Sequence, residues 1–346
     1  MDKSLRVGII GAGRIAELGH LPGYQRAGAQ VVALCGTDAE NLQRLGRAFG
    51  VERCTTDWHS MLAAGGLDAV SICTPPALHA EMAIACAQHG YHVLVEKPMA
   101  TSLTDCHQMI AAAGSANVLL MVAHNQRFSE RHRIAKEILD SGRLGRPYAV
   151  HGAFAHGGPE NWSPNQTWYF DGRAPRFGVM ADLGSHKIDL LRWLLQQEVT
   201  ELSAFDTTFE KATTVDDTAV LALRFSGGTL ATLYVGWTHR PDYVDHLTIQ
   251  CERGTLFIPT DAAQPVRLLE SSADGATVET TFPFGSEDGA GWWATVAAFV
   301  AAVTHRHPSP ISGADGKATM AAVLAAYEAV THKSVVQLNP ISFGGL

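Results

Sequence analysis

The first third of the chain alternates short apolar runs with helix-length segments, and this alternation restricts the fold more than any other feature. Five runs of strand character lie between residues 5 and 124, with the sequences LRVGII, QVVALC, DAVSIC, HVLVE and VLLMVA. None of them alternates apolar with polar residues, which is typical of strands buried on both faces of a sheet. Amphipathic, Ala-rich segments separate the runs. The pattern predicts an α/β fold with a doubly wound parallel sheet in a dinucleotide-binding domain, residues 1–124.

The pattern changes after a predicted helix at residues 129–141. Four runs, TAVLALRF, GTLATLYVGW, DHLTIQC and GTLFI, are joined by short turns such as Ser226-Gly227-Gly228, which is typical of antiparallel hairpins. A helix at residues 179–196 interrupts this half, and two strongly apolar helices at residues 291–303 and 314–333 close it. We expect a second, α+β domain at residues 125–346, a cleft between the domains, and C-terminal helices that pack back on the first.

The bulk composition excludes several classes of function. A formal net charge of −8, with no basic stretch, argues against a nucleic-acid partner and against an anionic membrane surface. The sequence shows neither a long apolar span nor a secretory signal before Leu5, so we expect a cytoplasmic protein. Six scattered cysteines and sixteen histidines show no metal-ligand spacing, so we expect reduced thiols and no metal.

The sequence VGIIGAGRIAELGH carries a G-x-G-x-x-A motif where the first strand runs into the first helix. Small residues there permit a tight turn, a close approach of the backbone to a pyrophosphate, and packing of helix on strand. The N-terminus of the helix would present unpaired N–H groups to the phosphates. The motif therefore predicts a dinucleotide site at Gly11, Ala12, Gly13, Arg14 and Ile15.

The choice between NAD and NADP depends on the end of the second strand. A carboxylate there would hydrogen-bond the ribose of NAD, but Gly36 and Thr37 occupy the position and Asp38 comes one residue later. Absence of that carboxylate favours NADP slightly, although no adjacent arginine is present to bind the 2′-phosphate. Asp38 is equally explained as the N-cap of a helix that begins at Ala39.

The segment HVLVEKPMA places Lys97 at the carboxyl end of an apolar strand, where ligands of open α/β sheets bind. Glu96 beside it suggests an ion pair, which would matter little on a solvated surface. Because the strand is uniformly apolar, we expect the pair to emerge from the core. Pro98 fixes the turn that aims the lysine.

Asp182 and His186 lie four residues apart in the predicted helix 179–196, so both side chains would face the same point. Imidazole is suited to take up and return a proton near neutral pH, and a carboxylate on the same helical face can orient it. We expect His186 to be the acid/base, Asp182 to orient it, and Lys97 to bond the reacting oxygen or share the proton. The alternative is a contact that only stabilises the helix.

A glycine-, proline- and aromatic-rich loop precedes that helix. Its aromatic residues could stack on the face of a substrate and its polar residues could bond the substrate's hydroxyl groups, or the aromatic residues could pack into the core. The candidates are His156, Asn161, Trp162, Trp168, Tyr169 and Arg173. Arg127 is a further candidate for contact with substrate or cofactor, with an ion pair to Asp or Glu across the domain junction as the alternative.

These segments together resemble the Gfo/Idh/MocA family, over almost the whole chain and in order. The resemblance rests on the nucleotide turn, Thr74-Pro75 with His79, Glu96-Lys97-Pro98, Asn125-x-Arg127-Phe128, Asp182-x-x-x-His186, and the final helix. Two departures stand out: Pro76 replaces a frequent Asn, which could alter a cofactor contact, and RFGVMADLG is thinner in glycine than usual, which could reshape the substrate pocket.

The resemblance implies a Rossmann-type N-terminal domain, a C-terminal domain on a large open sheet, and NAD(P)-dependent oxidation or reduction of a sugar, inositol or related polyol. It also extends the expected cofactor contacts, which are Gly36, Thr37, Thr74, Pro75, Pro76, His79, Glu96, Lys97 and Asn125. Self-association as a homodimer or homotetramer would cover the open sheet. Two other functions remain open: transient oxidation that assists glycoside processing, and a dinucleotide-binding sensor without chemistry.

Overall fold

The computed structural model describes residues 4–161, 163, 167–170, 177–272, 274–286 and 290–339. Contacts divide the chain into two compact units, each with one β-sheet. The first unit comprises Met1–Asn125 and Asp288–Met320, and the second comprises Gln126–Glu287 and Ala321–Leu346. The first unit thus contains a late stretch of the chain in addition to the N-terminal region.

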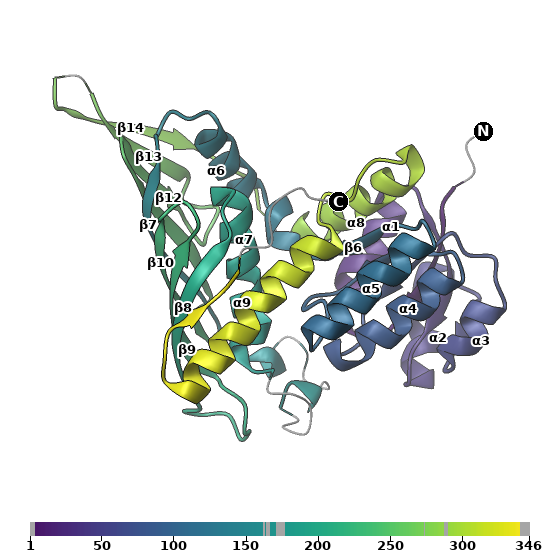
Figure 1. Ribbon diagram of the computed structural model, residues 1–346. Coiled ribbons are helices and arrows are strands. Elements are labelled where there is room, and N and C mark those ends of the chain that lie inside the picture. The colour runs from purple at the N-terminus through teal and green to yellow at the C-terminus, as the bar shows by residue number, and fades with distance from the viewer. Residues whose placement is uncertain are drawn as a thin grey trace. The chain divides into compact units, whose positions relative to one another are not determined.

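The first unit has a six-stranded parallel sheet in the order β3-β2-β1-β4-β5-β6 (Figure 1). The strands are β1 (Arg6–Ile10), β2 (Gln30–Cys35), β3 (Arg53–Thr55), β4 (Ala69–Ile72), β5 (His92–Val95) and β6 (Leu120–Val122). All five predicted runs form strands, and β3 is an edge strand that the pattern missed. Strands β4 and β6 are wholly buried, as their lack of alternation requires.

Helical segments join these strands. They are η1 (Ala16–His20), α1 (Leu21–Arg26), α2 (Ala39–Phe49), α3 (Trp58–Ala63), η2 (Pro76–Leu78), α4 (His79–Gln88) and α5 (Leu103–Ser115). Helix α8 (Ala290–His305) also belongs to this unit but comes later in the chain, after β14. Asp38, Asp57 and Ser102 begin three of the helices as side-chain N-caps. Helix α8 packs on η1 and α1, where a Cβ on Gly23 would come within 2.8 Å of the Val296 Cβ.

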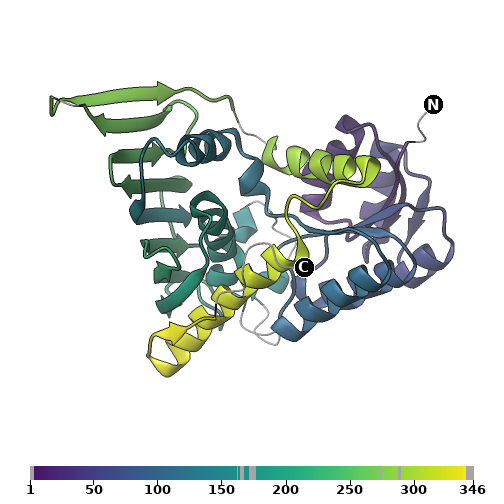
Figure 2. The same cartoon turned by 45° about the horizontal axis from the view of Figure 1, so that its top comes forward.

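The second unit has a nine-stranded sheet in the order β14-β13-β12-β11-β7-β10-β9-β8-β15. Its strands are β7 (Pro147–Ala155), β8 (Val199–Thr207), β9 (Thr218–Phe225), β10 (Leu230–Gly236), β11 (Val244–Cys251), β12 (Gly254–Ile258), β13 (Val266–Ser271), β14 (Thr277–Phe282) and β15 (Val336–Gln337). Only β7 and β10 pair in parallel, among the described strand pairs of this sheet. The hairpin β13–β14, light green in Figure 2, forms one end. The predicted sheet is confirmed as mainly antiparallel.

Helices α6 and α7 pack on the sheet of the second unit (Figure 1). The helical segments of this unit are η3 (Asn125–Phe128), α6 (Glu130–Asp140), η4 (Pro159–Asn161), η5 (Thr167–Phe170), η6 (Met180–Gly184), α7 (Ser185–Leu195) and the end of α9 (Gly313–His332). The predicted helix 179–196 is π-helical at its start, in η6, and ten of the eleven α7 residues are buried. Within the described ranges, no helix has both the length and the apolar character needed to cross a bilayer.

Candidate active site

The expected cofactor residues gather at one edge of the parallel sheet of the first unit. Gly11–Ile15 follow β1, Gly36 and Thr37 follow β2, and Thr74–Pro76 follow β4. Glu96 and Lys97 follow β5, and Asn125 comes three residues after the end of β6. Because all these strands are parallel, their carboxyl ends lie at the same sheet edge, and the strand order reverses between β1 and β4.

The turn after β1 has the shape that lets a ligand approach the backbone closely. Gly11 has φ +100°, and a Cβ there would lie 2.5 Å from the backbone of Cys73. A Cβ on Gly36 would come within 2.9 Å of the Ala12 Cβ. Among the described side chains, none caps the N-terminus of η1. A tight glycine turn that opens onto an uncapped helix fits the pyrophosphate of a dinucleotide.

The end of β2 carries charges of both signs. Asp38 caps α2, since its carboxylate accepts the Asn41 N–H at 3.1 Å, and the interpretation of Asp38 as an N-cap is confirmed. The Asn41 side chain donates to the Ala12 carbonyl oxygen at 2.6 Å, and this hydrogen bond connects α2 to the glycine turn after β1. Arg44 and Arg14 both contact Glu17, at 2.8 and 3.5 Å. Two guanidinium groups therefore share one carboxylate near this edge.

His79 braces two loops. Its Nε2 lies 2.8 Å from the Thr74 carbonyl oxygen and its Nδ1 lies 3.0 Å from that of Pro98, and the ring is fully buried. Burial lowers the pKa of His79, although both carbonyl groups oppose that shift. Because both ring nitrogens contact the backbone, we interpret His79 as a brace beneath the loops after β4 and β5. The direct cofactor contact that the resemblance implies for His79 stays a prediction.

Glu96 is held inside the first unit. Its Oε1 lies 3.0 Å from the His20 Nε2, and its Oε2 accepts the backbone N–H of Lys97 at 3.1 Å. Burial alone would raise the pKa of Glu96, but the His20 hydrogen bond and nearby positive charge outweigh it and hold the pKa below its ordinary value. The pair does emerge from the core, and the Lys97–Pro98 peptide bond is cis.

Asp182 and His186 lie in the second unit, in η6 and α7, and both are buried. The Asp182 carboxylate accepts the indole N–H of Trp237 at 3.1 Å. The His186 ring meets Phe154 edge to face, with centroids 5.5 Å apart. The two residues are thus anchored by β7 and by the end of β10. A buried carboxylate and imidazole on one helical segment can orient and move a proton.

Arg127 forms an internal ion pair. Its Nε and Nη2 each donate to Asp189 at 2.7 Å, and both side chains are buried. An ion pair is therefore present, but it lies within the second unit and not across the domain junction as the alternative expected. The pair gives Arg127 a role in supporting α7, and its contact with substrate stays a prediction.

The loop before η6 and α7 is described only in part. Trp162 and Arg173 lie outside the described residues, as does the side chain of Trp168. Tyr169 is buried and packs edge to face on Trp237, with ring centroids 6.1 Å apart, which favours the core-packing alternative. The His156 Nδ1 accepts the Gly158 N–H at 3.0 Å, which assigns the ring proton of the neutral form to Nε2.

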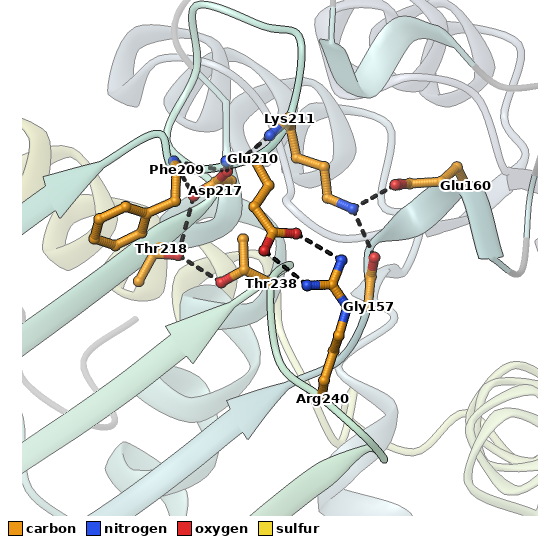
Figure 3. Close-up of polar contacts among 9 residues, drawn as sticks. All are labelled: Gly157, Glu160, Phe209, Glu210, Lys211, Asp217, Thr218, Thr238 and Arg240. Carbon is orange, nitrogen blue, oxygen red and sulfur yellow. Dashed lines mark hydrogen bonds and ion pairs between the residues drawn. The ribbon is translucent and has the colours of Figure 1, made fainter.

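The loop between β8 and β9 contacts the first residues of the loop that begins at His156 (Figure 3). The Lys211 ammonium donates to the Gly157 carbonyl oxygen at 2.6 Å and pairs with Glu160. Asp217 in turn accepts the backbone N–H groups of Phe209, Glu210 and Lys211. Burial of Asp217 opposes ionisation, but these donors outweigh it and lower the pKa. The loop that carries His156 is thereby fastened to the sheet.

One buried cluster was missed by sequence reasoning. Asp245 accepts hydrogen bonds from Gln126, Arg131 and Tyr243 and pairs with Lys187, which is fully buried. Burial lowers the pKa of Lys187, whereas the charges of Lys187 and Arg131 lower that of Asp245 despite its burial. The Lys187 ammonium lies 5.5 Å from the Phe154 ring, which contacts His186. The sequence signal that could have indicated this cluster was Lys187, a charged residue within a predicted helix of mostly apolar residues.

Comparisons with known proteins agree with this architecture. Residues 5–124 match the model described as "Oxidoreductase family, NAD-binding Rossmann fold", and residues 132–257 match the "GFO/IDH/MocA C-terminal domain". Myo-inositol 2-dehydrogenase of Thermotoga maritima is 28% identical over 276 residues, 78% of this chain and 80% of the relative. The 1,5-anhydro-D-fructose reductase of Ensifer adhaerens is 30% identical over 234 residues, 67% of this chain and 69% of the relative.

A solved structure supports the same assignment. The WlbA dehydrogenase from Bordetella pertussis, in complex with NADH and UDP-GlcNAcA, superposes with a TM-score of 0.81 at 28% identity, covering 98% of this chain and 100% of that chain. Within the described residues, no group of three or more His, Cys, Asp or Glu side chains could hold a metal ion. The chain belongs to the GFO/IDH/MocA family and is an NAD-binding oxidoreductase of the dehydrogenase and reductase type.

Proposed function

We propose that the protein moves a hydride between a nicotinamide cofactor and a hydroxyl-bearing carbon of a sugar, an inositol or a related polyol. The relatives named myo-inositol 2-dehydrogenase and 1,5-anhydro-D-fructose reductase support this substrate class. The bound nicotinamide would accept or supply the hydride. The protein's own side chains would handle the proton and orient the alcohol.

In the oxidation direction, His186 takes the hydroxyl proton as the carbon–hydrogen bonding pair leaves as hydride and the carbonyl forms. Asp182, fixed by Trp237, orients the imidazole and stabilises its charged form. Lys97 donates a hydrogen bond to the reacting oxygen. The same groups return the proton in the reduction direction, so the chemistry does not fix the physiological direction.

One observation carries this proposal. Lys97 follows β5 at the sheet edge that also holds the glycine turn after β1, and β1 and β5 are separated by β4 alone. A titratable group at the edge that fits a dinucleotide is what hydride transfer requires and what a pure dinucleotide sensor does not. For the substrate, we propose contacts from His156, Trp162 and Trp168.

The test begins with a screen of sugars and inositols against both cofactors, followed by absorbance of the reduced nicotinamide. Lys97→Met and His186→Asn should each lower kcat by about a hundredfold or more, the usual contribution of a proton-transferring group. Lys317→Met and the exposed His107→Asn serve as matched controls and should retain the wild-type rate. Wild-type turnover in Lys97→Met or His186→Asn would refute the assigned chemistry.

The same screen separates the competing functions. Product formation from a glycoside without net change in nicotinamide absorbance, with cofactor that stays bound through purification, would indicate transient oxidation. Cofactor binding without turnover of any compound, unchanged in Lys97→Met, would indicate a sensor.

We further propose a preference for NADP. Gly36 and Thr37 bring no carboxylate to the end of β2, and Arg44 on α2 and Arg14 supply positive charge near it. Titration of both cofactors against tryptophan fluorescence tests this preference. Arg44→Ala should weaken NADP binding and leave NAD binding unchanged, whereas tighter binding of NAD by the wild-type protein would overturn the preference.

We also propose a homodimer or homotetramer formed through the open sheet face. Phe205 and Val220 are opposite each other in neighbouring strands and are 79% and 48% exposed. Tyr234 pairs with Val220 on the next strand, which extends the apolar strip. Light scattering should show an oligomer that Phe205→Asp dissociates, and a monomeric wild-type protein would refute the proposal.

A further inference from the structure

Four buried polar side chains form a chain of hydrogen bonds beneath the turn that carries Lys97. Tyr24 Oη lies 2.6 Å from Ser71 Oγ, and Ser71 Oγ lies 3.0 Å from His20 Nδ1. His20 Nε2 lies 3.0 Å from Glu96 Oε1, and Glu96 Oε2 accepts the Lys97 backbone N–H. All these residues belong to the first unit.

The chain has a definite direction. Glu96 is ionised, because its pKa is lowered, and a carboxylate only accepts hydrogen bonds. The His20 Nε2 must therefore carry a proton and donate it. In a neutral imidazole Nδ1 is then an acceptor, so the Ser71 hydroxyl donates to Nδ1 and the Tyr24 hydroxyl donates to Ser71.

The four polar side chains of this hydrogen-bonded chain are buried in the core, where apolar residues are the rule. Tyr24 and Ser71 are wholly buried, His20 is 3% exposed and Glu96 is 9% exposed. Buried polar groups need every partner in place, and apolar side chains of similar volume would stabilise the same space with less demand on geometry. The chain also joins two functional segments, since His20 ends η1, the helix after the phosphate turn, and Glu96 precedes Lys97.

We propose that His20 is a positioning residue for Lys97. It acts through Glu96: the Nε2–H donor holds the carboxylate, the carboxylate holds the Lys97 N–H, and Ser71 and Tyr24 fix the tautomer that makes this possible. This inference depends on the proposed role of Lys97 in the reaction. His20 touches neither substrate nor cofactor in this scheme.

The first test needs neither cofactor nor activity. Nitrogen-15 NMR of histidine-labelled protein, in mildly alkaline buffer, should show His20 as the neutral Nε2–H tautomer. The signals are assigned by their loss in His20→Gln, with the exposed His107→Gln as control. Ser71→Ala removes the donor to Nδ1 and should change the His20 signals. An Nδ1–H tautomer or an imidazolium in the wild-type protein would overturn the inference.

The second test is kinetic. His20→Leu should lower kcat by about tenfold to a hundredfold, the effect of losing a hydrogen bond to a charged group, with KM for the cofactor nearly unchanged. His20→Gln retains an N–H donor toward Glu96 and should restore most of the rate. In a Lys97→Met background, His20→Leu should have no further effect. If His20→Leu does not fold, the kcat values of Ser71→Ala and Tyr24→Phe are compared instead. The larger loss of kcat is expected in Ser71→Ala.

The outcomes separate the two proposals. Full activity of Lys97→Met would refute the proposed function, whatever the state of His20. Impaired Lys97→Met together with wild-type kcat in His20→Leu or Ser71→Ala would refute only the positioning role. Equal losses from His20→Leu in the wild-type and Lys97→Met backgrounds would show that His20 does not act through Lys97 and would refute it as well.

Discussion

Replacement of Arg127 by methionine tests whether this residue supports the fold or binds substrate. The substitution removes two charge-assisted hydrogen bonds of 2.7 Å and leaves the Asp189 carboxylate, 1% exposed, without its main partner. Breaking a buried pair on one side destabilises a protein by about 3–5 kcal/mol. Arg192 lies 4.0 Å from the same carboxylate but already pairs with Glu198. We therefore expect a loss of about 3 kcal/mol, near the lower end of that range.

Equilibrium unfolding in urea measures this loss, and hydrogen exchange in peptides from α7 locates it. Asp189→Leu combined with Arg127→Met removes both charges and should recover much of the stability, since no buried charge is left unpaired. Arg240 and Glu210 form an equally bidentate pair on the surface, so Arg240→Met is a matched control that should leave stability unchanged.

The reasoning would be refuted by Arg127→Met with wild-type stability and normal exchange in α7. An increase in KM for the substrate at unchanged stability would restore the original expectation that Arg127 binds substrate.

Three further predictions follow from the described contacts. Burial raises the pKa of Asp216 from 3.8 to about 6, so the folded form binds this proton more tightly than the unfolded form does. The free energy of unfolding should therefore fall by about 3 kcal/mol as pH rises through that window. Urea midpoints measured across the window should show this fall in the wild-type protein and a flatter profile in Asp216→Asn. Lys211→Met should release the loop at Gly157 and raise KM for the substrate more than it lowers kcat. Limited proteolysis should then cleave the loop faster, and a wild-type rate of cleavage would contradict this prediction. Gly11→Ala should abolish cofactor binding in fluorescence titrations, because its Cβ would lie 2.5 Å from the Cys73 backbone.

The first unit could be predicted well because its strands differ from their surroundings in composition. Runs such as HVLV and AVSI have no alternation, and each has a charged residue at one end, Glu96 after HVLV and Asp68 before AVSI, which favours buried parallel strands. The exception, β3, has three residues, lies at the sheet edge and includes the exposed Arg53. Nothing in so short a polar segment distinguishes a strand from a loop.

The second unit was predicted only where one face of a strand is apolar. β9 alternates strictly, with Ala219, Leu221, Leu223 and Phe225 buried, and was recognised. β14 has no buried residue, and β15 is two residues long and exists only through its pairing with β8. Such strands are defined by their partners, which local patterns do not reveal.

Motifs located the candidate site, but not the contacts that hold it. Glycine turns and the Glu96-Lys97-Pro98 segment depend on local backbone shape and could be found from spacing. Arg127 and Asp189 are 62 residues apart, and Arg131 and Asp245 are 114 apart. Many acidic residues in the sequence could have served as either partner, and the tertiary fold alone selects one.

The division of the first unit along the chain has a consequence for its synthesis. All six parallel strands leave the ribosome before residue 126, whereas α8, which packs on η1 and α1, emerges only after eight of the nine strands of the second sheet, all but β15. At about 5–20 residues per second, the apolar surface around Gly23 waits about 15–55 seconds for Val296. During that interval the nascent first unit lacks α8, and a fragment that ends at residue 125 would lack this helix permanently.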